Sequence, residues 1–161
     1  MDEASQEALA RRLVETYSDQ LLRLSWSLLG SLPDAQDICQ EVLLKRLAYT
    51  GLFQDTGHER AWMIRVTINA CKNLRRSLWR RRTVPLEEQA DQPVFQPTPG
   101  GILEELQTLP IHDRQVLILY YYIGYNAQEI AQILGIKADA ARARLARARA
   151  KLKQRLEVQE K

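Results

Sequence analysis

Seven basic side chains lie in one short stretch near the C-terminal end, with no acidic residue between Asp139 and Glu157. Cationic groups on a helix can pair with phosphates, and arginine can also pair with guanine in a major groove. The chemistry that this stretch could perform is therefore binding of a nucleic acid, with a solvated amphipathic helix as the alternative. The seven are Arg142, Arg144, Arg147, Arg149, Lys151, Lys153 and Arg155.

The segment before this basic helix has the spacing of a helix-turn-helix. Ala131 is small where two helices would cross closely, and Gly135 follows at the point where a positive φ is favoured. Ile130, Leu134 and Ile136 supply an apolar seam. Because the turn and the charge coincide, the pattern favours nucleic-acid binding over a solvated helix.

Charge is unevenly distributed along the chain, although its net value is only +3. Residues 72–82 hold six basic residues and no acidic one, whereas residues 1–48 hold eight acidic and five basic residues. Two separate basic patches suggest two contacts with one polyanion. The acidic N-terminal part suggests a different partner.

Composition excludes several classes of protein. Hydrophobic residues at 45% and charged residues at 27% are globular values. Cys39 and Cys71 lie in helical patterns and are not clustered with a histidine, which predicts buried reduced thiols in a cytosolic protein and no metal site. No signal peptide or membrane span is recognised. The sequence contains no recognisable nucleophile–base pair and no phosphate-binding glycine loop. We therefore expect no enzymatic activity, no cofactor and no small-molecule substrate.

Three helices are expected in the N-terminal part. Apolar residues recur at helical spacing over residues 9–28, and Asp34 is the predicted N-cap of a second helix that runs to about Tyr49. Residues 51–57 form a loop, and a third helix spans about residues 59–82. That helix is expected to bury Trp62, Val66 and Ile68.

Residues 83–100 contain four prolines and no basic residue, a composition that favours an extended, flexible connector. We therefore expect two small domains, residues 1–82 and 101–161. The second is expected to contain helices over 102–108 and 111–123 before the helix-turn-helix. Residues 116–123 could also pass for a buried strand, but the pattern as a whole predicts an all-α fold.

Several motifs in the same order resemble those of bacterial sigma factors of the extracytoplasmic-function type. Residues 34–42, DAQDICQEV, resemble the family's D-A-E-D-hydrophobic-x-Q-E signature, and residues 60–69, RAWMIRVTIN, resemble R-A-W-L-x-R-I-A-x-N. Leu109-Pro110, Glu129-Ile130-Ala131 and residues 144–149 resemble the family's region 4. The resemblance covers about residues 10–156.

The resemblance implies promoter recognition and transcription initiation, with no reaction catalysed by this chain. In the family, region 2 binds the β′ clamp of core RNA polymerase and opens the −10 element, while region 4 reads the −35 element as a duplex. The implied partners are core RNA polymerase, through its β′ clamp and β flap, and promoter DNA. An anti-sigma factor is a further expected partner.

Site residues follow from the resemblance and from helical spacing. Positions 37, 41, 44 and 45 can share one helix face, which is either a polymerase contact or an ordinary solvated face. The expected polymerase contacts are Asp37, Gln40, Glu41, Leu44 and Lys45. The expected DNA contacts are Asn69, Lys72, Arg75, Arg76, Arg80, Gln128, Lys137, Arg142, Arg144, Arg147 and Arg149. The loop that holds a flipped base is expected to use Phe53, Gln54 and Asp55.

The chain also departs from the family pattern. The usual G-T-V-K-S-R run of the recognition helix is DAARAR here, so Ala140, Ala141 and Ala143 replace two hydroxyl residues and a core valine. Base reading is then expected to depend on Arg142 and Arg144, although Arg144 could instead form an ion pair within the domain. Trp79 could pack on DNA or only cover the helix end.

Two other functions compete with this interpretation. An autonomous helix-turn-helix repressor or activator would share the basic helices but would leave the Trp62 segment unexplained. An RNA-binding protein could use both patches, but no aromatic-rich sheet or glycine-rich clamp is recognised. Transcription with core polymerase discriminates, because a sigma factor restores initiation whereas a repressor blocks it.

Overall fold

The computed structural model describes residues 2–80 and 105–159, and every regular element within these ranges is a helix. The chain divides into two compact units, Met1–Val94 and Phe95–Lys161. The predicted all-α class is confirmed. The predicted connector, residues 83–100, lies outside the described residues.

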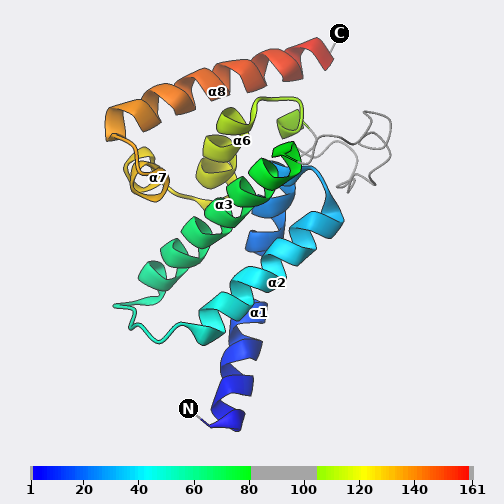
Figure 1. The fold of residues 1–161 in the computed structure, drawn as a ribbon. Coiled ribbons are helices and arrows are strands. Elements are labelled where there is room, and N and C mark those ends of the chain that lie inside the picture. Colours follow the sequence, from blue (N-terminus) through cyan, green and yellow to red (C-terminus); the bar gives the residue numbers. More distant parts are fainter. Residues whose placement is uncertain (1, 81–104, 160–161) are drawn as a thin grey trace. The chain divides into compact units, whose positions relative to one another are not determined.

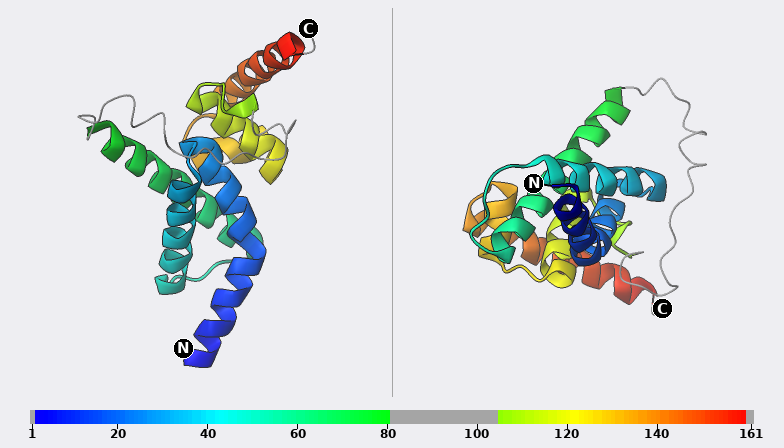
Figure 2. Two further views of the ribbon diagram at one scale, coloured as in Figure 1. Left: turned by 90° about the vertical axis from the view of Figure 1, so that its right-hand side faces the viewer. Right: turned by 90° about the horizontal axis from the view of Figure 1, so that it is seen from below.

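Three helices that pack against one another form the first unit (Figure 1): α1 (Glu3–Leu29), α2 (Leu32–Ala48) and α3 (Thr56–Arg80). Asp2 caps the start of α1 by accepting a hydrogen bond from the Ser5 amide, and Gly30 ends the helix at φ 71°. The first turns of α1 extend beyond the other two helices, as the left view of Figure 2 shows. The helices therefore meet mainly along the later part of α1.

Two predicted helix starts were wrong. The second helix begins at Leu32, because Ser31 rather than Asp34 is the N-cap and accepts a hydrogen bond from the Asp34 amide at 3.4 Å. Pro33 lies in the first turn, where a helix needs no backbone donor. The third helix begins at Thr56, three residues before the predicted start.

The core of the first unit is formed by aliphatic side chains of all three helices, together with Trp26. On α3 the buried face carries Met63, Ile64 and Ile68. The prediction that Trp62 and Val66 are core residues was wrong, because both lie beside that face and stay partly exposed.

Both cysteines are free and buried, as predicted. Burial raises the pKa of the Cys71 thiol to about 12 and also raises that of Cys39. Both side chains therefore stay protonated near neutral pH and behave as small apolar core groups.

The second unit contains α6 (Ile111–Leu117), a π-helix η1 (Ile118–Ile123), α7 (Ala127–Leu134) and α8 (Ala138–Gln159). The helix predicted over 111–123 is confirmed and the strand alternative is excluded, although its second half is wound as a π-helix. Gly124 ends it at φ 93°. Of the helix predicted over 102–108, only Glu105 and Leu106 are described as helical, and residues 101–104 lie outside the described range.

The helix-turn-helix consists of α7, a turn at Gly135 and α8. Gly135 has a φ of 70°, and the carbonyl of Ala131 accepts hydrogen bonds from the amides of Gly135 and Ile136. Ile130 is fully buried. Asn126 and Glu129 form a reciprocal capping box at the start of α7, a signal present in the sequence as N-x-x-E that the prediction missed.

Asn126→Ala should destabilise α7 because it removes the side-chain acceptor for the Glu129 amide. The expected loss is about 1 kcal/mol of local stability. Amide hydrogen exchange across α7 and α8 measures this loss. Gln128→Ala, an exposed position in the same helix, should leave exchange unchanged, and equal exchange in both variants would contradict the prediction.

Candidate functional site

A shallow groove follows the outer face of α2. The five predicted polymerase contacts line it together with Ala48: Asp37, Gln40, Glu41, Leu44 and Lys45. Leu44 is 57% exposed, and the Glu41 carboxylate lies 3.1 Å from the Lys45 ammonium. The structure therefore brings these side chains together as one surface with an apolar centre and a mainly acidic rim.

A row of polar and basic residues follows the second half of α3. Asn69, Arg75 and Arg76 are exposed and Lys72 is partly exposed. Asn69, Lys72 and Arg76 are spaced by three and four residues, so they share one face. The side chains of Trp79 and Arg80, in the last turn, lie outside the described part of the structure. The row is accessible to a phosphate backbone along its described length.

An aromatic cluster lies where the loop between α2 and α3 meets α3. The Phe53 ring lies 5.3 Å from Tyr49, 5.8 Å from Trp62 and 5.2 Å from His58, and Tyr49 lies 4.8 Å from Trp62, between ring centroids. Trp62 thus belongs to this cluster and not to the core. Sequence reasoning found Phe53 but missed the three rings around it.

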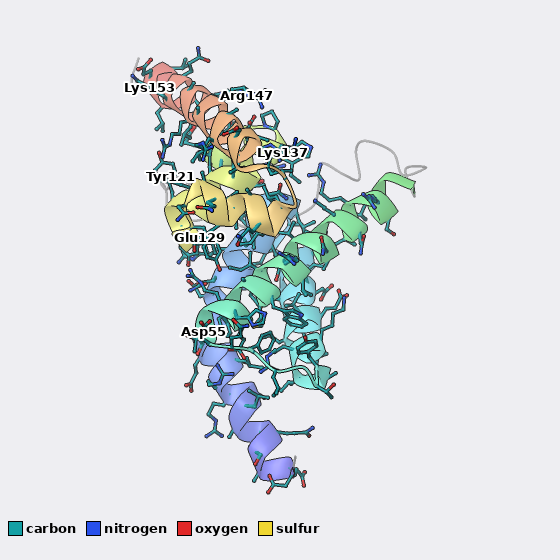
Figure 3. All side chains as sticks on the ribbon, turned by 90° about the vertical axis from the view of Figure 1, so that its left-hand side faces the viewer. Asp55, Tyr121, Glu129, Lys137, Arg147 and Lys153 are labelled. Carbon is teal, nitrogen blue, oxygen red and sulfur yellow. The ribbon has the colours of Figure 1, made fainter. Side chains whose placement is uncertain are left out.

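The two polar residues predicted for the base pocket lie in the same loop. Asp55, which is labelled in Figure 3, caps α3, since its carboxylate accepts a hydrogen bond from the His58 backbone amide at 2.8 Å. The Gln54 amide donates to Nδ1 of His58 at 3.1 Å. Asp55 therefore has a structural role at the helix start.

A buried carboxylate, Glu59, joins all three helices of the first unit and was missed by the sequence analysis. Its Oε1 accepts hydrogen bonds from Arg12 at 2.9 Å and from the Tyr17 hydroxyl at 2.7 Å. Its Oε2 accepts from Arg12 at 2.9 Å and from Arg46 at 3.0 and 2.8 Å. No local signal predicts this cluster, because Glu59 is separated from each of its three partners by 13 to 47 residues.

These contacts set the charge of the cluster. The hydrogen bonds from Arg12, followed by those from Tyr17 and Arg46, lower the pKa of Glu59 to about 2 against the opposing effect of burial. Burial and the nearby carboxylate raise the pKa of Tyr17 to about 12. Glu59 is therefore ionised and Tyr17 is neutral at neutral pH.

The helix-turn-helix presents most of its predicted DNA contacts to solvent. Gln128, Lys137, Arg142, Arg147 and Arg149 are exposed and Arg144 is partly exposed. Figure 3 shows Lys137 at the turn before α8, and Arg147 and Lys153 along it. The helix packs on the unit through a face of small and aliphatic residues: Ala141, Leu145, Ala148 and Leu152.

Three of the cations on α8 already have partners in the same unit. Arg142 pairs with Asp139. Lys151 lies 2.8 Å from the buried carboxylate of Asp113 on α6, so it holds α8 in place. Arg149 stacks on the ring of Tyr120, with its guanidinium carbon 4.4 Å from the ring centroid.

Over residues 2–80 and 105–159, no group of three or more candidate ligands could hold a metal ion. Within the same ranges, no helix has the length and apolar character needed to cross a membrane.

The fold and these surfaces define a helical DNA-binding protein, and comparisons with known proteins give its family. The model of Sigma-70 region 2 matches residues 13–81, and that of Sigma-70 region 4 matches residues 100–152. The sigma factor SigL of Mycobacterium tuberculosis is 32% identical over 88% of this chain and 85% of its own length. SigM of the same species is 28% identical over 88% of this chain and 74% of its own length.

Solved structures share the fold of this chain. The sigma factor RpoE of Bartonella quintana, in complex with the anti-sigma factor NepR, superposes with a TM-score of 0.71 at 20% identity, over 92% of this chain and 96% of that one. CnrH, in complex with the cytosolic domain of CnrY, superposes with a TM-score of 0.66 at 22% identity, over 92% of this chain and 88% of that one. The chain belongs to the extracytoplasmic-function RNA polymerase sigma factors, which bind DNA and direct transcription initiation by RNA polymerase.

Proposed function

We propose that residues 1–82 bind the β′ clamp of core RNA polymerase and open the −10 element, and that residues 101–161 bind the −35 element, with residues 83–100 as the linker. The observation that carries this proposal is the groove on α2, where all five predicted polymerase contacts meet. The polymerase would perform the chemistry of transcription, and this chain would perform none. The cytoplasm, where bacterial transcription takes place, is the proposed location.

The groove on α2 fits a basic and partly apolar partner helix. Asp37 and Glu41 carry negative charge, and Leu44 offers an exposed aliphatic contact between them and Ala48. Opposite charges across an interface guide the encounter, while an apolar contact that becomes fully buried supplies most of the binding free energy.

The loop between α2 and α3 fits a single DNA strand, and the row of polar and basic residues on α3 fits the phosphate backbone of that strand. Aromatic rings stack on a base that has left the duplex, at about 1–3 kcal/mol per base, which offsets the cost of unstacking. Tyr49, Phe53 and Trp62 provide such rings at the start of α3. Asn69, Lys72, Arg75, Arg76 and Arg80 would then follow the phosphates.

The second unit fits duplex DNA, with α8 as the recognition helix. The absence of long side chains at positions 140 and 143 leaves base contacts to Arg142 and Arg144, with Gln128, Lys137, Arg147 and Arg149 as backbone contacts. Binding of this unit to the β flap is part of the same proposal. An anti-sigma factor is a further proposed partner, because the structurally similar sigma factor RpoE is solved in complex with the anti-sigma factor NepR.

Run-off transcription from a randomised promoter pool, with purified core RNA polymerase, tests this function. Adding the chain should restore initiation from a subset of templates that share two spaced elements. An autonomous repressor would bind duplex templates without polymerase and lower the transcript yield. Failure of the chain to co-elute with core polymerase would contradict the proposal directly.

Arg147→Ala should weaken binding to duplex promoter DNA about equally for all sequences. The slope of log K against log salt should become smaller by about 0.9, the change expected when one phosphate contact is lost. Titrations at several salt concentrations measure this slope. Arg11→Ala is a matched control on α1, and an unchanged slope for Arg147→Ala would remove this residue from the interface.

Single abasic substitutions through the −10 element should locate the flipped base. Open-complex formation should fall strongly at one position, because stacking on the loop rings is lost there, and weakly elsewhere. Permanganate reactivity of the opened strand measures the extent of opening. Equal tolerance at all positions would contradict the stacking role of the loop.

A further inference from the structure

Arg46 joins the buried Glu59 cluster to the aromatic loop, because its guanidinium contacts both Glu59 and Phe53. Glu59 is 4% exposed and lies near the start of α3. The two arginines that bind it differ in their surroundings. The Arg46 side chain is 12% exposed, whereas that of Arg12, on α1, is 44% exposed.

The Arg46 guanidinium contacts the loop as well as the carboxylate. Its carbon lies 4.8 Å from the centroid of the Phe53 ring, while Nε and Nη2 donate to Oε2 of Glu59. A guanidinium that donates two hydrogen bonds to one carboxylate oxygen is fixed in orientation. It can then hold an aromatic ring in place through a cation–π contact. Arg12 contacts the same carboxylate without such a ring contact.

Phe53 is the ring that the other members of the cluster share. Tyr49, His58 and Trp62 each lie within 5.8 Å of it, between centroids. A shift of Phe53 would therefore disturb every ring that could stack on a base. The loop between α2 and α3 has few other anchors in the described structure, apart from the hydrogen bonds of Gln54 and Asp55 with His58.

We propose that Arg46 is a positioning residue for promoter opening: fixed by the buried Glu59, it holds Phe53 and thereby the rings that receive the flipped base. The inference rests on the loop function proposed above. It assigns to a residue outside the loop a specific effect on the single-stranded step. Binding of polymerase and of duplex DNA does not depend on this contact.

Arg46→Met and Arg12→Met form a matched pair for the test. Each removes one cation from Glu59, but only the first removes the support of Phe53. Holoenzyme affinity is measured on two probes taken from the selected promoter pool, a full duplex and a fork junction whose non-template −10 strand is single. The ratio of the two affinities isolates the single-stranded step.

Arg46→Met should lower the fork-to-duplex ratio about two- to thirtyfold, the range of a partly buried cation–π contact. Arg12→Met should leave the ratio unchanged although it also weakens the fold. In a Phe53→Ala background, Arg46→Met should lower the ratio no further. Equal losses for the two arginine variants, or additive losses with Phe53→Ala, would overturn the positioning role.

The failure of the loop function itself has a separate signature. If Phe53→Ala keeps the fork-to-duplex ratio, the rings do not receive a base and both proposals are overturned. If Phe53→Ala lowers it and Arg46→Met does not, only the positioning role is overturned. If Arg46→Met does not fold, Arg46→Lys replaces it in the measurement. Lysine keeps a positive charge beside Glu59, and this variant should still lower the fork-to-duplex ratio.

A measurement without DNA checks the contact directly. The chain has two phenylalanines, Phe53 and Phe95, so fluorinated phenylalanine gives two signals, and Phe53→Leu assigns them. Arg46→Met should shift or broaden the Phe53 signal, and Arg12→Met should leave it in place. An unmoved Phe53 signal in Arg46→Met would overturn the inference.

Discussion

Combining Glu41→Lys with Leu44→Ala is expected to abolish binding to core RNA polymerase while the chain stays folded. The first change reverses charge in the groove on α2 and the second removes its exposed aliphatic contact. A central contact in such an interface is worth about 2 kcal/mol or more, so the expected loss of affinity from Leu44→Ala alone is at least about thirtyfold, and the charge reversal at Glu41 adds to it. Co-elution and fluorescence titration with core polymerase measure it.

Folding should survive because neither side chain belongs to the core. The Glu41–Lys45 pair is exposed, and a like-charge pair in its place costs about 0.5 kcal/mol. Glu7→Lys with Val14→Ala is the matched control on α1, since Glu7 pairs with Arg11 at the same spacing and Val14 is half exposed. If both double variants bind equally well, the groove is not the polymerase contact.

Glu59→Ala is expected to destabilise the first unit strongly. It leaves Arg12 and the mostly buried Arg46 without their shared carboxylate, and breaking a buried ion pair in this way costs about 3–5 kcal/mol. All three tryptophans lie in residues 1–80, so tryptophan fluorescence in urea reports the unfolding of this unit alone. Glu7→Ala, which breaks an exposed pair, should change stability by less than about 1 kcal/mol.

The same carboxylate predicts the dependence of stability on acid. The pKa of Glu59 in the folded chain is about 2, below its ordinary value of 4.5. Its contribution is therefore complete above pH 4.5 and is lost as the pH falls from there toward 2. Glu59→Gln should flatten the stability profile in that window. A profile identical to that of the unaltered chain would contradict the depressed pKa.

Patterns within one helix could be predicted from the sequence, and contacts between distant elements could not. The face of α2, the basic end of α3 and the turn at Gly135 are each defined by spacings of three or four residues. Glu59 depends on Arg12 and Arg46, which no local spacing relates to it. Trp62 was misplaced because an aromatic residue in an apolar stretch suits the core and the rim of a helix almost equally.

Helix ends and winding were also only partly predictable. Ser31 and Asp34 are both good N-cap residues, and the choice between them depends on where α1 ends. The apolar run from Val116 to Ile123 identifies a buried element, but the same residues suit an α-helix and a π-helix. The apolar side chains of this run therefore predict a buried element, but they do not predict its π-helical winding.

The contact between Arg12 and Glu59 determines where a fragment of this protein should begin. The Sigma-70 region 2 match begins at residue 13, one position after that arginine. A fragment cut at the edge of the family match would keep the acid and lose its bidentate counter-charge. Fragments intended to behave like the intact protein should therefore begin at or before Asp2, which also preserves the cap of the first helix.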